Sequence, residues 1–408
     1  MRRSFCQFLS ASLCVVVLVL GVGCERQSAP EALVLKVGVI ASLSGEGQRD
    51  GAITVNCATV IADYYNEQGG VEVDGEHYRV ELLVRDDTSE ASQAAEIAYD
   101  FVNLGDVHYV IGAEGDAVSE AVAPILDSAG ILYLHYGLSY RLLARASCGV
   151  LARPRSIQMF ARVVDYLKEN QDDQEELSIC LLVGKTRAAM YQKLKIEEMV
   201  EQAGIEVVRF ARFDVTEAVF DLSETPEVVE SFVARVVSSQ PSLVILCGQQ
   251  DGSLPLAMSY LRGGGYTGGV IARSPRVLID RGVEGSWVDG LLLVSSSVPI
   301  EERSRYYLDL KERYLDQFSD WNTDVDLKLY ALESVLRRVA LSGRDALSSS
   351  EVLLEPIQFP DPFLVEERLM GFGQRRSLSA SRQLSVPIIL SNYSEGEAQV
   401  VYRSDSSF

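Results

Sequence analysis

Two turns in the chain carry hydrogen-bonding groups in a pattern typical of a small-molecule binding site. The first turn, residues 113–116, lies between an apolar run at 109–111 and a segment of helical period that starts at 116 and ends at Gly130. The second turn, residues 135–140, follows the apolar run 131–134. A strand, a helix and a strand in so short a span predict a right-handed βαβ unit. Ligands of parallel sheets bind beyond the carboxyl ends of the strands, so we expect the bound molecule to contact both turns.

The sequence favours binding over catalysis, because it lacks the motifs of the common enzyme classes. It has no nucleophile elbow, HExxH motif or P-loop, and no motif-placed Ser/His/Asp set. The turn at 112–115 lacks the full GxGxxG pattern, and the turn at 42–45 is not a phosphate loop. No CxxC or Cys/His spacing indicates a zinc site. We therefore predict a protein that is not an enzyme and that needs no cofactor or metal.

Length and composition limit the class of protein and its partners. The 408 residues are too many for one ordinary core and suggest two domains. Apolar residues make up 47% and charged residues 23%, which is typical of a globular body. The formal net charge of −21 argues against nucleic acid or an anionic membrane surface as a partner.

The N-terminus resembles that of an exported bacterial lipoprotein. Two arginines precede the apolar run 13–22, which is too short to span a bilayer comfortably and is typical of a signal peptide. The run ends in Gly-Val-Gly-Cys, which resembles a lipobox, and Cys24 is the acylated residue that this resemblance implies. Because the usual leucine is displaced to Leu20, an uncleaved anchor is the alternative. We expect a signal peptide at 1–23, a lipidated tether at 24–34, and a location on the outer face of a bacterial membrane.

From residue 35 onward, segments typical of strands and helices alternate, which predicts an α/β fold of two doubly wound lobes. We expect an N-lobe at 35–153 completed by about 288–358, and a C-lobe at 154–287 completed by about 359–408. Expected strands lie at 35–40, 78–84, 109–111, 131–134, 177–183, 206–210, 242–247, 270–272, 291–295, 387–390 and 399–402. Expected helices lie at 52–66, 116–129, 157–167, 188–203, 228–238, 254–262, 302–318 and 324–341, with one more after an N-cap at Ser89.

The order of several segments resembles the leucine/isoleucine/valine-binding family of ABC-transporter solute-binding proteins. These segments are VGVIASLSG, GAITVNCATVIADYYNEQGG, VELLVRDDTSEASQAAEIAYDFV, VIGAEGD, AVAPILDSAGILYL and GLSYRL. The resemblance implies a type I periplasmic-binding fold: two Rossmann-like lobes, joined by three crossovers, that close around a small ligand. It also implies an ABC permease as partner.

The resemblance places the first half of the ligand site on the two turns. It implies contacts from Gly115, Asp116 and Ala117, and from Gly137 and Ser139. A serine is common in the family where Asp116 stands, and an acid there would repel a carboxylate and attract an ammonium or hydroxyl group. The alternative is that the acid caps the following helix. The loop at 46–50 is shorter than usual in the family.

Further candidates have weaker support. Tyr136 is either a ligand contact or a core aromatic residue. In the second lobe the resemblance implies ligand contacts from Tyr191, from Gln249 in the turn at 248–251, and from Arg273. Arg273 stands near the position of an acid that binds the ammonium of amino acids. Either Asp116 or an acid at 251 supplies this charge, or the ligand is not an α-amino acid.

We predict an extracytoplasmic solute-binding lipoprotein that captures a small polar ligand, either an amino acid or a related amide or carboxylate, for an ABC importer. The alternative is a sensing or scaffolding lipoprotein that kept the binding fold without transport.

Overall fold

The computed structural model describes most of the chain after its N-terminal segment. The described residues are 33–105, 107–139, 142, 145–170, 178–183, 187–202, 204, 206–208, 226–247, 254–272, 285–296, 298–318, 321–366, 368–375 and 382–404. The expected signal peptide and Cys24 lie outside these residues.

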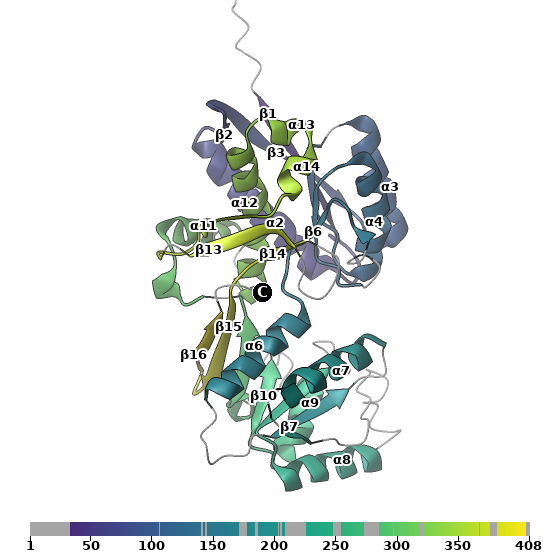
Figure 1. The fold of residues 1–408 in the computed structure, drawn as a ribbon, viewed down its shortest axis with the longest axis vertical. Helices are drawn as coiled ribbons and strands as arrows, with labels where there is room; N and C mark the ends of the chain where they lie inside the picture. The colour runs from purple at the N-terminus through teal and green to yellow at the C-terminus, as the bar shows by residue number, and fades with distance from the viewer. Residues whose placement is uncertain are drawn as a thin grey trace, which may run out of the picture. The chain divides into compact units, whose positions relative to one another are not determined.

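The first sheet has nine strands in the order β12-β13-β14-β6-β5-β4-β1-β3-β2 (Figure 1). Neighbouring strands β1, β4, β5 and β6 are parallel, which confirms the βαβ unit expected around the two turns. Antiparallel pairs extend both edges. The strands are β1 (Val34–Ala41), β2 (Val71–Val73), β3 (Glu76–Asp86), β4 (Tyr109–Gly112), β5 (Tyr133–His135), β6 (Gly149–Leu151), β12 (Ile357–Pro360), β13 (Leu369–Arg375) and β14 (Arg382–Ser385).

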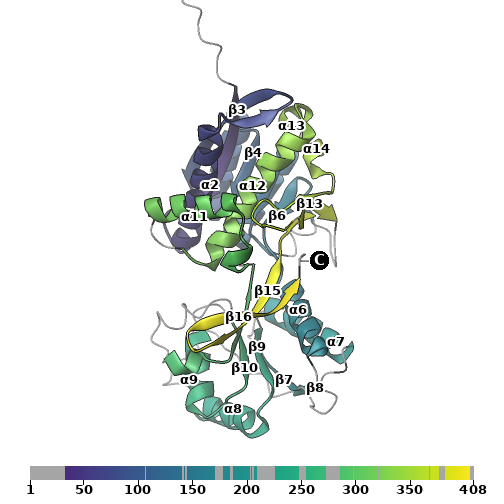
Figure 2. The same ribbon diagram turned by 90° about the vertical axis from the view of Figure 1, so that its left-hand side faces the viewer.

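Helices cover both faces of this sheet (Figures 1 and 2). Helices α3 (Ala91–Leu104) and α4 (Asp116–Ala129) pack side by side on one face. On the other face, α2 (Gln48–Glu67) packs against α11 (Arg305–Phe318) and α12 (Thr323–Ser342), followed by α13 (Asp345–Ser348) and α14 (Ser350–Leu354). Because both faces are covered, the central strand β1 is buried without a break from Val37 to Ala41.

The second sheet has seven strands in the order β16-β15-β11-β10-β9-β7-β8. In β7, Ile179 and Leu181 pack toward one cluster and Cys180 and Leu182 toward another, as the two-residue period of a strand requires. The elements are β7 (Ser178–Val183), β8 (Glu206–Val208), β9 (Leu243–Cys247), β10 (Gly269–Ala272), β11 (Leu291–Ser295), β15 (Ile388–Ser394), β16 (Glu397–Ser404), α6 (Ser156–Glu169), α7 (Arg187–Gln202), α8 (Pro226–Ser239), α9 (Leu254–Gly263), η1 (Gly285–Val288) and η2 (Ile300–Glu302).

The chain passes between the two sheets three times, after β6, after β11 and between β14 and β15. The second and third crossings fall later than the lobe divisions expected near 288 and 359. Strand β11 belongs to the second sheet because it pairs with β10 and β15. Strand β14 joins the first sheet parallel to β6, and β13 and β12 follow as antiparallel neighbours. Their segment holds no long apolar run, so the sequence pattern did not reveal them.

Two local expectations need correction. Helix α2 begins at Gln48, four residues before the expected start. Helix α3 has Glu90, not Ser89, as its N-cap. The hydroxyl of Ser89 instead donates to the Ser44 carbonyl and accepts the Gly47 N–H at 2.9 Å, so it joins two turns rather than capping a helix.

Within the described residues, no helix is long and apolar enough to cross a membrane. The thiols of Cys57 and Cys148 are buried and free, and burial raises the pKa of both. These two cysteines are therefore small core residues in this structure.

A close backbone contact explains a glycine inside α2. A Cβ added to Gly51 would lie 2.1 Å from the carbonyl oxygen of Ser42, in the turn after β1. Helix propensity alone favours alanine over glycine by about 1 kcal/mol. We expect Gly51→Ala to destabilise the fold instead, by roughly 2 kcal/mol, because the turn must move. Thermal unfolding followed by circular dichroism measures the change.

The control is Gly285→Ala in η1, where an added Cβ meets nothing within 4 Å. The free energy of unfolding of this variant should lie within about 0.5 kcal/mol of the wild-type value. A higher midpoint for Gly51→Ala than for wild type would show that helix propensity outweighs the contact.

Candidate functional site

The first sheet changes its winding direction between β1 and β4. From β1 the chain continues to β3 on one side, and then to β4, β5 and β6 on the other. Parallel sheets bind ligands beyond the carboxyl ends of the strands at such a switch point. The residues at these ends are Ser42 after β1, Asp87 after β3, Glu114 after β4 and Tyr136 after β5.

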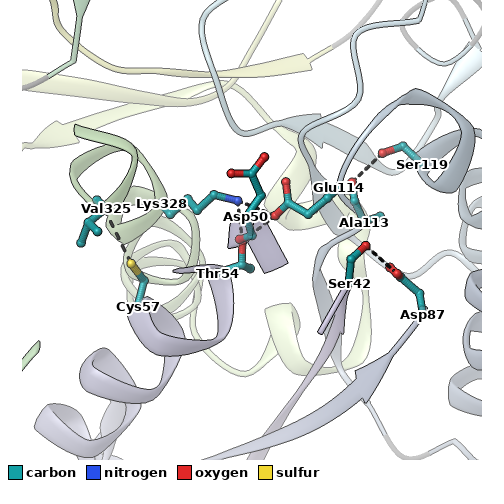
Figure 3. A network of polar contacts seen from close by, with 10 residues as sticks. All are labelled: Ser42, Asp50, Thr54, Cys57, Asp87, Ala113, Glu114, Ser119, Val325 and Lys328. Atoms are coloured by element: carbon teal, nitrogen blue, oxygen red, sulfur yellow. Dashed lines mark hydrogen bonds and ion pairs between the residues drawn. The ribbon is translucent and has the colours of Figure 1, made fainter. Parts of the chain in front are cut away.

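The turn after β4 is unusually tight. Gly112 has a φ of 111°, and an added Cβ would lie 2.0 Å from the Ile40 carbonyl oxygen, so only glycine fits. Ala113 follows with a φ of 58°, and its N–H donates to the same carbonyl at 2.8 Å. The Ser119 hydroxyl donates a hydrogen bond to the Ala113 carbonyl at 2.6 Å and so holds the turn in this conformation. Glu114 is thereby directed toward α2 and α12 (Figure 3).

A buried ion pair lies at the centre of this edge. Lys328 of α12 and Glu114 are 6% and 9% exposed, and their Nζ and Oε1 atoms are 2.5 Å apart. Lys328 Nζ also donates to Thr54 Oγ1 at 2.7 Å, and Thr54 Oγ1 donates to Glu114 Oε1 at 2.5 Å. Figure 3 shows the three side chains converging from α2, α12 and the turn after β4. Each charge offsets part of the desolvation cost of the other, which would be high for a single buried ion.

An aromatic ring lies against the same ammonium, and a buried thiol contacts α12 one turn before the lysine. Lys328 Nζ lies 4.1 Å from the ring centroid of Tyr136, a distance suited to a cation–π interaction. Burial and the nearby Glu114 carboxylate raise the pKa of Tyr136, so its hydroxyl is protonated. Cys57 Sγ lies 3.7 Å from the Val325 carbonyl oxygen, one turn of α12 before the lysine. Tyr136 is therefore part of this cluster as well as a candidate ligand contact.

Two consecutive acids lock the neighbouring turns together. Asp86 accepts hydrogen bonds from Leu43, Ser44 and Thr88, which together outweigh its burial and lower its pKa. Asp87 is fully buried, and burial raises its pKa although Ser42 and Ser89 donate to its Oδ1 at 2.6 and 2.8 Å. The turns after β1 and β3 are thus fixed by each other.

A third acid joins the two turns that the sequence singled out. Asp116 is the first residue of α4, but the N-cap residue is Gly115 and no side chain caps this helix. Asp116 Oδ1 instead accepts the Leu138 N–H at 2.5 Å. The capping role considered for this residue is therefore replaced by a bridge to the second turn.

The structure brings the expected N-lobe residues together at one edge. Gly115, Asp116 and Ala117 are exposed, Tyr136 and Gly137 are buried, and Ser139 is half-buried. A Cβ on Gly137 would lie 2.7 Å from the Ser119 side chain, which explains the glycine. Ser139 Oγ accepts the Leu142 N–H at 3.2 Å, and within the described residues its hydroxyl donates no hydrogen bond, so a ligand could accept its proton. Each of these residues is still a predicted ligand contact.

His135 and the second-lobe candidates differ from this group. Burial lowers the pKa of His135 to about 4, so it is a neutral core residue. Tyr191 lies on α7, and its side chain is outside the described part of the structure. Gln249 and Arg273 also lie outside the described residues, as does the acid at 251.

Sequence reasoning missed Thr54, Glu114 and Lys328. A signal for the lysine existed, because Val325, Lys328 and Leu332 share one face of a helix whose other members on that face are apolar. A charge at such a position indicates a buried partner. The partner itself could not be read from the pattern, because it lies more than two hundred positions earlier in the chain.

Comparison with known proteins gives the family. The profile of the family described as periplasmic binding protein matches residues 34–332, which is most of the chain. The chain belongs to this family. None of the curated proteins matches the chain in sequence.

Solved structures of similar fold support the same assignment. The substrate-binding protein LivJ of Streptococcus pneumoniae, in complex with isoleucine, has a TM-score of 0.66 at 14% identity and covers 91% of this chain and 100% of its own. A solute-binding protein of Rhodopseudomonas palustris, in complex with 3,4-dihydroxybenzoic acid, has a TM-score of 0.66 at 15% identity and covers 91% and 98%. A protein of Desulfitobacterium hafniense, in complex with leucine, has a TM-score of 0.65 at 16% identity and covers 91% and 100%.

The family and the fold confirm the main expectations from the sequence. The chain has the type I periplasmic-binding fold, and its resemblance to the leucine/isoleucine/valine-binding proteins is confirmed. By its family the chain is a periplasmic binding protein. Solved structures that share its fold are substrate-binding proteins of ABC transporters.

The buried ion pair predicts a large effect for Lys328→Met. Methionine keeps most of the side-chain volume but leaves the Glu114 carboxylate buried without its counter-charge. We expect a loss of about 3–5 kcal/mol in the free energy of unfolding, measured by urea titration. Adding Glu114→Gln to this variant should recover part of the loss, because the amide carries no charge.

The matched control is Arg344→Met. Arg344 pairs with Glu76 at 2.7 Å, but the two side chains are 55% and 42% exposed. Exposed pairs contribute less than about 1 kcal/mol. Equal losses for the lysine and arginine variants would mean that burial does not strengthen the Lys328 pair.

Proposed function

We propose that this chain captures a small polar solute outside the cytoplasm and delivers it to an ABC permease. The observation that carries this proposal is the group of turns at the switch point of the first sheet, whose hydroxyl, carboxylate and backbone groups lie at one edge. The relatives named above were solved with isoleucine, leucine or a hydroxylated benzoic acid. An amino acid or a related amide or carboxylate is therefore the starting class of ligand.

The proposed contacts come from both lobes. They are Gly115, Asp116, Ala117, Tyr136, Gly137 and Ser139 in the first lobe, and Tyr191, Gln249 and Arg273 in the second. Ligand binding would favour a closed conformation over an open one, and the permease would recognise the closed form. No contact in the described part of the chain favours the alternative of a sensing or scaffolding protein without transport.

We also propose that the chain is exported and anchored by a lipid on Cys24. The support is the N-terminal sequence, with its basic start, its short apolar run and its lipobox-like end. A tether of about ten residues would then hold the binding protein near the permease.

A ligand screen tests the binding proposal. The full chain, as its host processes it, is screened by thermal shift against amino acids, amides, urea and small carboxylates. A ligand at 100 times its Kd raises the free energy of unfolding by about 2.7 kcal/mol, which gives a clear shift. Ser139→Ala should weaken binding about fivefold, because one hydrogen bond of about 1 kcal/mol is lost.

Ser128→Ala is the matched control for this variant. Ser128 lies near the other end of α4, where its hydroxyl donates to the Ile125 carbonyl at 2.8 Å. Its removal should leave ligand affinity unchanged. Equal weakening by both variants would exclude a specific role for Ser139, and the absence of any ligand from a folded protein would refute solute capture.

Cys24→Ser tests the lipid anchor. The variant should lose labelling by radioactive palmitate and should no longer be processed, as followed by mass spectrometry of the membrane fraction. Cys14→Ser, within the apolar run, is the control and should be labelled like wild type. A wild-type protein that keeps residues 1–23 and carries no lipid would establish the uncleaved anchor instead.

A further inference from the structure

The second turn offers a backbone hydrogen-bond donor that Asp116 already occupies. Asp116 Oδ1 accepts the Leu138 N–H at 2.5 Å, in the middle of the second turn. Leu138 lies between Gly137 and Ser139, two residues proposed to contact the ligand. A carboxylate of the protein therefore binds the backbone of this turn before any ligand arrives.

The same residue sets the charge at the start of α4. The first N–H groups of a helix are unsatisfied within the helix, and they favour an anion. Here Asp116, in the first turn of α4, already supplies that negative charge. A ligand carboxylate at this point would meet a like charge within a few ångströms, which disfavours binding.

The buried cation at this edge of the sheet, Lys328, does not offset this repulsion. Lys328 is paired with Glu114 and lies over the ring of Tyr136, so its charge is already compensated. Arg153, after β6, is a second cation whose field reaches Tyr136. A carboxylate that bound this lobe through Arg153 would contradict a role for Asp116, and Arg153→Gln tests that case.

The second carboxylate oxygen of Asp116 can accept a further hydrogen bond. This oxygen makes no hydrogen bond within the described part of the chain, and the residue is exposed. An ammonium, hydroxyl or amide group of a ligand could donate to this oxygen, and a charge-assisted bond of this kind is strong.

We infer that Asp116 is a specificity-determining residue that replaces the ligand carboxylate on the second turn. The ligand consequently presents a hydrogen-bond donor, in the form of an amine, hydroxyl or amide, to the first lobe. This inference rests on the proposed function, because it concerns the ligand of the same site.

Matched pairs of compounds test the inference on the full chain. Each pair differs only in its carboxylate: leucine and leucinol, phenylalanine and phenylalaninol, benzoate and benzyl alcohol, butyrate and butylamine. Binding is measured by thermal shift and calorimetry. Wild type should bind the member without a carboxylate about tenfold or more tightly in at least one pair.

Two substitutions separate the charge from the hydrogen bond. Asp116→Asn keeps an acceptor for the Leu138 N–H but removes the charge. Asp116→Ser also frees the N–H group and should shift preference toward the carboxylate member by about tenfold or more. Asp127→Asn is the matched control, because Asp127 accepts the Ser147 and Cys148 N–H groups near the other end of α4 and should leave the preference unchanged.

Hydrogen exchange provides a readout that needs no ligand. The Leu138 amide should be protected in wild type and in Asp127→Asn, and should exchange at least about tenfold faster in Asp116→Ser. Equal exchange rates in all three proteins would overturn the bridge on which the inference depends.

The outcomes distinguish this inference from the proposed function. Wild-type binding of the carboxylate members, unchanged in Asp116→Ser or lost in Arg153→Gln, would overturn the role of Asp116 while solute capture stands. No binding of any compound by wild type or by Asp116→Ser would overturn solute capture for small polar ligands, and this inference with it.

Discussion

The buried ion pair between Glu114 and Lys328 is the interaction on which the first lobe depends. Removing a carboxylate and an ammonium from water costs several kcal/mol for each ion, so the pair is stable only because Thr54 and the Tyr136 ring complete its surroundings. Its members come from α2, from the turn after β4 and from α12, segments far apart in the chain. The pair therefore fixes α12, which follows strands β7 to β11 of the second sheet in the chain, onto the edge that carries the two turns proposed to contact the ligand.

Hydrogen bonds to two neighbouring acids, Asp86 and Asp87, hold the turns near this pair in place. Asp86 receives enough hydrogen bonds to stay ionised, whereas burial opposes ionisation of Asp87. Together they hold the turn after β1 against the turn after β3, with Ser89 as a second link. A preformed edge of this kind lowers the ordering cost of ligand binding.

Local patterns were sufficient to predict most of the parallel core. Buried strands such as β4 and β9 are short apolar runs, and α4 shows a clear helical period, so each can be recognised without its partner. Strands β12 to β14 could not be predicted, because their segment holds no long apolar run and their pairing comes from the sheet they extend. Lys328 was missed for a related reason: its role depends on Glu114, and sequence spacing says nothing about a contact across the fold. The backbone bridge of Asp116 likewise depends on where two turns meet.

Solute-binding proteins of this fold can change ligands without changing their sheets, and the described lobe indicates how. Its core is held by apolar side chains of strands and helices, while the turns proposed to contact the ligand carry single polar residues such as Asp116. A zwitterionic ligand would bring a carboxylate and an ammonium, but this lobe already contains an internal carboxylate on the Leu138 amide and an internal ammonium on Glu114. Polar groups that satisfy one another stabilise the unliganded lobe. On the proposed function, a ligand would bind through the acceptor and donor positions that these internal pairs leave open, and the side chains at the turns, rather than the fold, would determine specificity.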